Sequence, residues 1–225
     1  MTELSQAAID AALQRAEEAV ARGEGLAGTG FWPAVAAARR DPAVAGPHAD
    51  RIAAVDRRAA STWALVRVPP LTGHALVAAG LVLGAAALAA AGGLDGSGQA
   101  AALLGGGLLL LLSTHAPAHW IAGRLVGIAF TGYFVASLHD PFPGVKIDYA
   151  TYLRASPRAR ALMHAAAPVV SKVVPFAVLG VAVAVDAAPA VRTVLLVVGI
   201  GQLAVDLAFS TRSGDWSKVL RELRG

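Results

Sequence analysis

Two histidines lie four positions apart in the segment 114–120, which reads Thr-His-Ala-Pro-Ala-His-Trp. Because an α-helix turns once in about 3.6 residues, His115 and His119 share one face if this segment is helical. Two imidazoles at this spacing are how a helix offers two ligands to a zinc ion. The chain has no cysteine, so a third ligand has to be another histidine or a carboxylate, and neither a disulfide nor a thiolate site is available.

The composition is that of a membrane protein. Hydrophobic residues make up 56% of the 225 positions and charged residues only 15%, whereas a soluble domain carries about a quarter charged residues. The apolar residues gather in blocks after residue 72. The sequence pI is near 10.0, but no basic stripe with interleaved aromatics is present, so we expect the lipid bilayer rather than nucleic acid as a partner.

Four apolar stretches are long enough to cross about 30 Å of hydrocarbon. The sequence therefore predicts an all-α integral membrane protein with about four transmembrane helices and an N-terminal cytoplasmic helical segment. The predicted parts are a helical segment over 1–70, a four-span membrane domain over 71–210 and an interfacial helix over 211–225. The expected spans are Gly73–Ala91, a run from Gln99 to about Gly123, a stretch within Leu162–Val185, and Ala190–Phe209.

The parts outside the membrane are also expected to be helical. Apolar spacing and breaker residues predict N-terminal helices over 4–21, 31–40 and about 49–66. A short tail helix is expected to start at Ser213 or Asp215. Its apolar positions recur at helical spacing, which fits either a helix lying in the membrane interface or a solvated terminal helix.

Lysine and arginine are distributed unevenly between the connections. The loop 92–98 and the turn 186–189 have none, whereas the connection 123–172 has six, the tail has four and the N-terminal segment has eight arginines. The excess of basic residues on cytoplasmic loops places both termini in the cytoplasm, at a bacterial inner membrane. Trp120–Leu138 is apolar enough for a fifth span, but crossing there would put Arg154–Arg160 outside. We expect a continuation of the second helix followed by a strand or re-entrant stretch.

Asp206 is the only acid within the fourth expected span, and it is the candidate third ligand. Counted along their spans at about 1.5 Å per residue, His115 and Asp206 both lie roughly 22–24 Å from the outer face. A His-His-Asp set with an open fourth position suits zinc. Two plainer interpretations remain: histidines at a helix end bonded to neighbours, and Asp206 paired with Arg212 or Lys172.

The sequence from His115 to His119, with the following Gly123–Ile128, resembles the HExxH pattern of the site-2 protease family of intramembrane zinc metalloproteases. Ala165–Pro168 is faintly similar to the Ala/Gly-Pro stretch of that family. The resemblance implies two histidine ligands on one helix and an aspartate ligand from a later span. It also implies hydrolysis of a peptide bond in a membrane-embedded protein substrate.

The chain departs from that pattern at the position of the catalytic glutamate, which is Ala116. Alanine cannot take a proton from water or deliver one to a leaving amine, a contribution typically worth about 10²–10⁴-fold. Three explanations stay open: a natural pseudo-enzyme, a protease whose glutamate has been replaced, or another base such as His164, Asp140 or Asp148. We expect little or no peptidase activity. The rival interpretation is a non-enzymatic membrane scaffold or partner-binding protein without metal.

Overall fold

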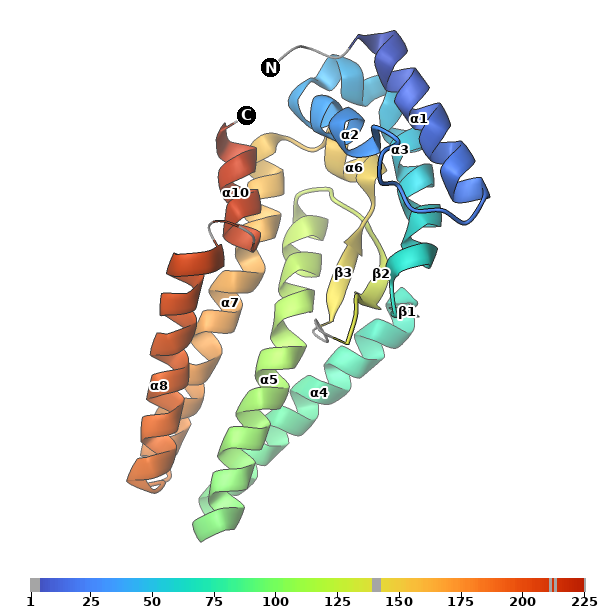
Figure 1. Cartoon of the computed structure of the whole chain (residues 1–225). Helices are drawn as coiled ribbons and strands as arrows, with labels where there is room; N and C mark the ends of the chain where they lie inside the picture. The colour runs from blue at the N-terminus through green and yellow to red at the C-terminus, as the bar shows by residue number, and fades with distance from the viewer. Residues whose placement is uncertain (1–4, 139–142, 211, 213, 225) are drawn as a thin grey trace.

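The computed structural model describes residues 5–138, 143–210, 212 and 214–224. Four long helices extend from one end of the molecule, and shorter helices and a small sheet gather at the other end, which we call the head (Figure 1). Both chain ends lie on the head side.

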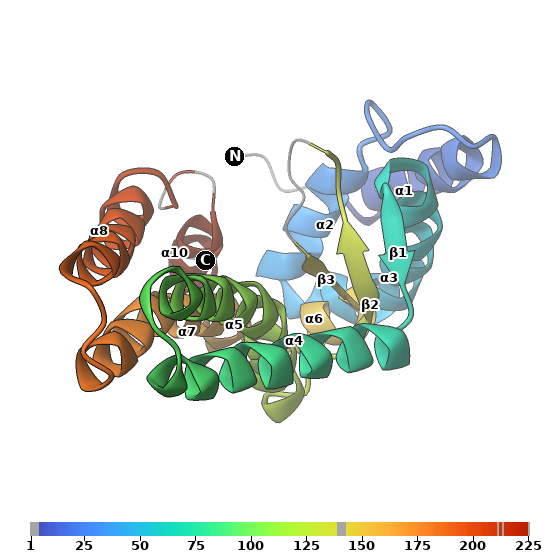
Figure 2. The same ribbon diagram turned by 90° about the horizontal axis from the view of Figure 1, so that it is seen from below.

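The long helices confirm the predicted integral membrane protein with four spans, because each is long and apolar enough to cross a bilayer. The turn between the first two, with its short helix η1 (Ala91–Gly93), and the turn between the last two lie at the end away from the head (Figure 1). α5 lies between α4 and α7 (Figure 2). The helices are α4 (Pro70–Ala90), α5 (Gly96–Leu125), α7 (Pro157–Ala184) and α8 (Pro189–Val205), the last continued by a π-helical turn, η2 (Asp206–Ser210).

The contested segment 120–138 does not form a fifth long apolar helix. α5 runs on to Leu125 and ends at Gly127, whose φ of 82° is the left-handed conformation that glycine adopts without strain. The N–H of Ile128 donates to the carbonyl of Gly123 at 2.8 Å, which closes the helix end. The chain then enters a strand, β2 (Phe130–Val135). The prediction of a continued helix followed by a strand is therefore confirmed.

The head begins with three helices, α1 (Gln6–Ala21), α2 (Phe31–Arg40) and α3 (Pro42–Trp63). The third starts earlier than the expected residue 49, because the Asp41 carboxylate accepts a hydrogen bond from the N–H of Ala43 at 2.8 Å and Pro42 occupies the first helical position. These helices share one buried apolar cluster with β2, with α6 (Tyr149–Arg154) and with α7. The head is thus packed directly onto the membrane helices.

The sheet joins the head to the start of the first span. It has three antiparallel strands in the order β1 (Val66–Val68), β2 and β3 (Gly144–Ile147). Arg67 of β1 lies opposite Phe134 of β2, and Tyr133 lies opposite Val145 of β3. β1 leads through Pro69 straight into α4, so the sheet stands at the membrane boundary.

Glycines let the membrane helices approach one another, as small residues do in bilayers. A Cβ added to Gly106 of α5 would lie 3.0 Å from the Ala87 Cβ and 3.0 Å from the Gly84 carbonyl oxygen, both on α4. A Cβ on Gly107 would meet Val178 of α7 at 3.3 Å. The neighbouring Gly105 has nothing within 4 Å of the added atom.

We therefore expect Gly106→Val to separate α4 from α5 and to lower the free energy of unfolding by about 1–3 kcal/mol, the usual cost of overpacking. The measurement is thermal unfolding of detergent-purified protein. Gly105→Val is the matched control, because it makes the same chemical change on the same helix where there is space. Equal effects of the two substitutions would contradict this account of the packing.

Candidate metal centre

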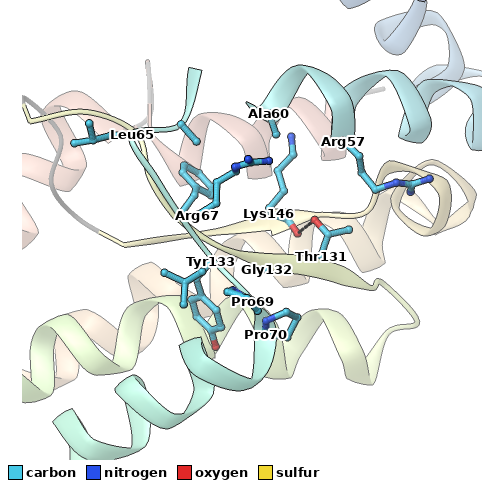
Figure 3. A pocket seen from close by; sticks show the side chains of 13 residues that line it. Arg57, Ala60, Leu65, Arg67, Pro69, Pro70, Thr131, Gly132, Tyr133 and Lys146 are labelled. Carbon is cyan, nitrogen blue, oxygen red and sulfur yellow. Dashed lines mark hydrogen bonds between the residues drawn. The ribbon is translucent and has the colours of Figure 1, made fainter. Parts of the chain in front are cut away.

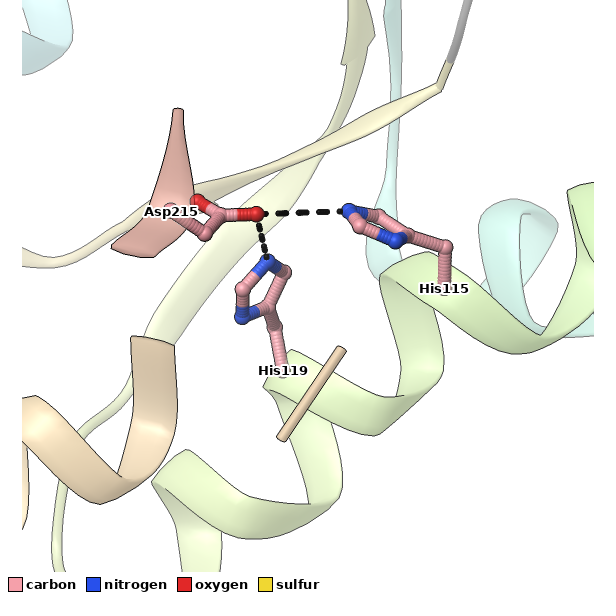
Figure 4. A group of neighbouring side chains, drawn as sticks. All are labelled: His115, His119 and Asp215. Carbon is pink, nitrogen blue, oxygen red and sulfur yellow. Dashed lines mark hydrogen bonds and ion pairs between the residues drawn. The ribbon is translucent and has the colours of Figure 1, made fainter. Parts of the chain in front are cut away.

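The two histidines of α5 face the C-terminal helix, α10 (Asp215–Arg224), on the head side (Figure 4). They lie one turn apart with ring centroids separated by 5.2 Å. His119 is almost buried, whereas 38% of the His115 side chain is exposed. At about 1.5 Å per residue, His115 lies about 29 Å along α5 from Gly96, which is close to the membrane boundary.

Asp215, the first residue of α10, completes the cluster. Its Oδ2 lies 3.2 Å from Nε2 of His119 and 3.5 Å from Nε2 of His115. One ligand-type atom from each of the three residues lies within 4.8 Å of the other two. Ligand atoms ~2.0–2.2 Å from a tetrahedral zinc ion lie ~3.3–3.6 Å from one another, so two of the three separations already match such a site. The cluster has the donors and the spacing to hold a metal ion.

The orientation of His119 is fixed by its second nitrogen. Nδ1 lies 2.8 Å from the carbonyl oxygen of Met163 on α7, and since a carbonyl only accepts, Nδ1 must carry the proton. A neutral His119 then presents a lone pair on Nε2 to the lone pairs of the Asp215 carboxylate. That contact requires either a second proton, making an imidazolium, or a cation between the two atoms. A carbonyl that holds the far nitrogen is the usual support of a histidine ligand.

The remaining oxygen of Asp215 is also engaged. Oδ1 accepts a hydrogen bond from Nζ of Lys218 at 2.8 Å, one turn along α10. Burial raises the pKa of the Asp215 carboxyl. This rise is outweighed by the hydrogen bonds with His115 and His119 and by the positive charges of His119 and Lys218, which lower the pKa. The net result is a pKa well below the usual range. Beside these positively charged neighbours Asp215 is therefore a carboxylate, and a carboxylate is the form that binds metals.

A buried acid holds α10 in place. The Glu222 side chain is 0% exposed, and its Oε2 accepts from Nε of Arg160 on α7 at 2.6 Å. Its Oε1 accepts from the Tyr152 hydroxyl of α6 at 2.9 Å and pairs with Arg39 of α2 at 3.3 Å. A buried carboxylate needs such partners for both oxygens. These contacts fasten α10, and with it Asp215, to three other helices.

The same network fixes His164 of α7. The Tyr152 hydroxyl donates its one proton to Glu222, so it can only accept from Nε2 of His164, which lies 3.0 Å away. The ring of His164 is 6.3 Å from that of His119. A chain of polar contacts thus runs from Glu222 through Tyr152 to His164, and the ring of His164 lies beside that of His119.

The ligand set expected from the sequence changes in one member, because the acid beside the histidines is Asp215 and not Asp206. The Asp206 carboxylate instead pairs with Nζ of Lys172 at 2.9 Å and accepts from Nε1 of Trp216 at 3.2 Å. An ion pair between Asp206 and Lys172 was one of the alternatives to metal binding that the sequence left open. α10 runs along α7 and, like α8, points toward the head (Figure 1). The first residue of α10 therefore lies beside the histidines.

The position at which the resemblance expects a base is buried. Ala116 is 1% exposed, so its side chain faces packed neighbours and not solvent. Asp148 pairs with Arg57 of α3 at 2.9 Å and does not belong to the cluster. Asp140 lies outside the described residues. Of the three alternative bases, the structure places His164 beside the histidines.

The sequence held a partial signal for Asp215. It marked this residue as a start of the tail helix, and the helix does start there, at the head-side end of the spans where the histidines lie. The sequence did not indicate that α10 packs on α7 with Val219 and Glu222 buried.

Comparisons of the chain with protein-family models, with curated proteins and with solved structures find no match.

We expect Glu222→Gln to leave the buried Arg160 guanidinium without its charged partner and to lower the free energy of unfolding by about 3–5 kcal/mol. Thermal unfolding in detergent measures the change. Glu24→Gln is the control, because it removes the charge from an exposed pair with Arg22, and exposed pairs contribute little. A Glu222→Gln protein as stable as the control would show that this network does not hold α10.

Proposed function

We propose that this membrane protein binds one divalent metal ion, preferentially zinc, through His115, His119 and Asp215. The observation that carries the proposal is the convergence of three ligand-type atoms within 4.8 Å, with Nδ1 of His119 committed to a carbonyl. Two imidazoles and one carboxylate match the donor preference of zinc, and they leave a fourth position for water or substrate. The partial exposure of His115 keeps that position accessible.

Each residue has a role in this proposal. Met163 orients His119 through its carbonyl, and Lys218 holds the second oxygen of Asp215, so that one oxygen faces the histidines. Bound zinc would supply Lewis-acid activation of a water molecule. The described cluster offers no carboxylate beyond Asp215 to accept a proton from that water.

We propose further that the chain is a degenerate relative of the site-2 proteases, with Asp215 as the acid ligand and with little or no peptidase activity. The reason is the alanine at the base position, which is buried against its neighbours. A membrane-embedded protein is the proposed substrate or binding partner. This proposal of a family and a substrate rests on the resemblance of the segment around His115 and His119 to the HExxH pattern of the site-2 proteases.

The proposed location is a bacterial inner membrane with both termini cytoplasmic. The two connections without lysine or arginine lie at the end away from the head, and the basic connections lie at the head (Figure 1). This uneven distribution of lysine and arginine between the two ends of the spans favours a cytoplasmic head. The metal site would then face the cytoplasm.

One observation favours the rival, a non-enzymatic membrane scaffold without metal. The histidines, Asp215 and Lys218 can also form a purely ionic cluster that ties α5 to α10, provided that His119 carries two protons. In that case the cluster would serve stability alone.

Metal analysis of the purified protein separates the two functions. We expect close to one zinc per chain and a fall to roughly a tenth or less in His115→Ala and in Asp215→Asn, because each removes one of only three protein ligands. Asp206→Asn is the matched control and is expected to keep the metal, since that acid contacts Lys172 and Trp216.

Absence of metal after incubation with zinc would favour the scaffold. Loss of metal in Asp206→Asn with retention in Asp215→Asn would restore the ligand set expected from the sequence.

A further inference from the structure

A second feature of the head lies away from the metal-type cluster. A cavity of about 720 Å³ opens between the C-terminal end of α3, the sheet and the start of α4 (Figure 3). Its apolar lining includes Leu65, Val68, Pro69 and Pro70, the last of which begins the first span. None of the metal-type residues lines it.

Three cationic side chains line this cavity, and no acidic side chain does. They come from three elements: Arg57 from α3, Arg67 from β1 and Lys146 from β3. Figure 3 shows Arg67 and Lys146 reaching into the same space. Cations gathered in this way create a positive potential that attracts an anion.

Only part of this charge is neutralised by neighbouring acids. Nζ of Lys146 lies 2.6 Å from Oδ1 of the buried Asp56, and Arg57 pairs with Asp148 at 2.9 Å. Arg67 is exposed and forms no ion pair with any residue of the described chain. Its planar guanidinium therefore remains available, and it suits the paired oxygens of a phosphate.

The cavity also lies at the level of the lipid headgroups. Pro69 and Pro70 line it, and the first span begins at Pro70. Large apolar side chains are exposed on both sides of this point, with Leu65 54% and Leu71 81% exposed. A cationic cavity bordered by exposed apolar side chains matches an amphiphile better than a soluble anion.

We propose that this cavity binds the phosphate headgroup of an anionic phospholipid. The phosphate lies against Arg67 with Lys146 and Arg57 nearby, and the acyl chains run past Leu71 along α4. Basic pockets at the cytoplasmic ends of spans bind anionic headgroups in this way. The bound lipid bridges α3 and the sheet to the first span, and this proposal does not depend on the metal.

The test uses the full chain in nanodiscs of phosphatidylcholine with an increasing fraction of phosphatidylglycerol, and follows the thermal unfolding midpoint. We expect phosphatidylglycerol to raise the midpoint. Arg67→Ala is expected to need about fivefold more phosphatidylglycerol for half of the effect, since one surface arginine contributes about that factor. Arg158→Ala is the control, an exposed arginine at the start of α7 on the same side of the membrane.

Three results would overturn the proposal. One is the absence of any preference for phosphatidylglycerol over phosphatidylcholine. Another is an equal effect of Arg67→Ala and Arg158→Ala, which would indicate only general surface charge. The third is an equal rise with inorganic phosphate added to phosphatidylcholine nanodiscs, which would assign the cavity to a soluble phosphate compound.

Discussion

The buried carboxylate of Glu222 is the constraint on which the candidate site depends. Burying a charge among helices is tolerated only when hydrogen bonds and opposite charges surround it. Arg160, Arg39 and Tyr152 meet that requirement from three helices, and all three partners must be in place together. The C-terminal helix is therefore held against α7 in one position. Asp215, two turns earlier on the same helix, is set beside the histidines of α5 as a consequence.

The resulting cluster has well-oriented ligand-type atoms, but its described residues include no further carboxylate that could act as a base. His119 is oriented through a backbone carbonyl and Asp215 through Lys218, which is how metal ligands are usually supported. The position that would carry a base is a buried alanine. Metal binding and peptide hydrolysis are separable here, because the first needs the three ligands and the second also needs a proton acceptor. This separation is why we place metal binding at the centre of the proposed function.

The sequence predicted most of the membrane architecture, because the length and apolar composition of a span are local properties. The charge distribution also favoured a helix followed by a strand over a fifth span in 120–138, and the structure has a strand there. The pairing of His115 with His119 followed from helical spacing alone. The third acid could not be found in this way. Distance along a span gives the depth of Asp206 but not the direction in which its side chain points. The packing of α10 on α7 brings a different aspartate to the histidines. The role of Glu222 depends on residues from three other helices, so no local pattern reveals it.

X-ray absorption spectroscopy at the zinc edge of the purified, zinc-loaded protein tests the central claim most directly, because it reports the atoms bound to the metal. The account predicts two imidazole nitrogens and one carboxylate oxygen at ~2.0–2.2 Å with one further light atom. It also predicts that one imidazole is lost in His119→Ala. A spectrum without imidazole scattering, or one unchanged in His119→Ala, would contradict a metal site at this place in the fold.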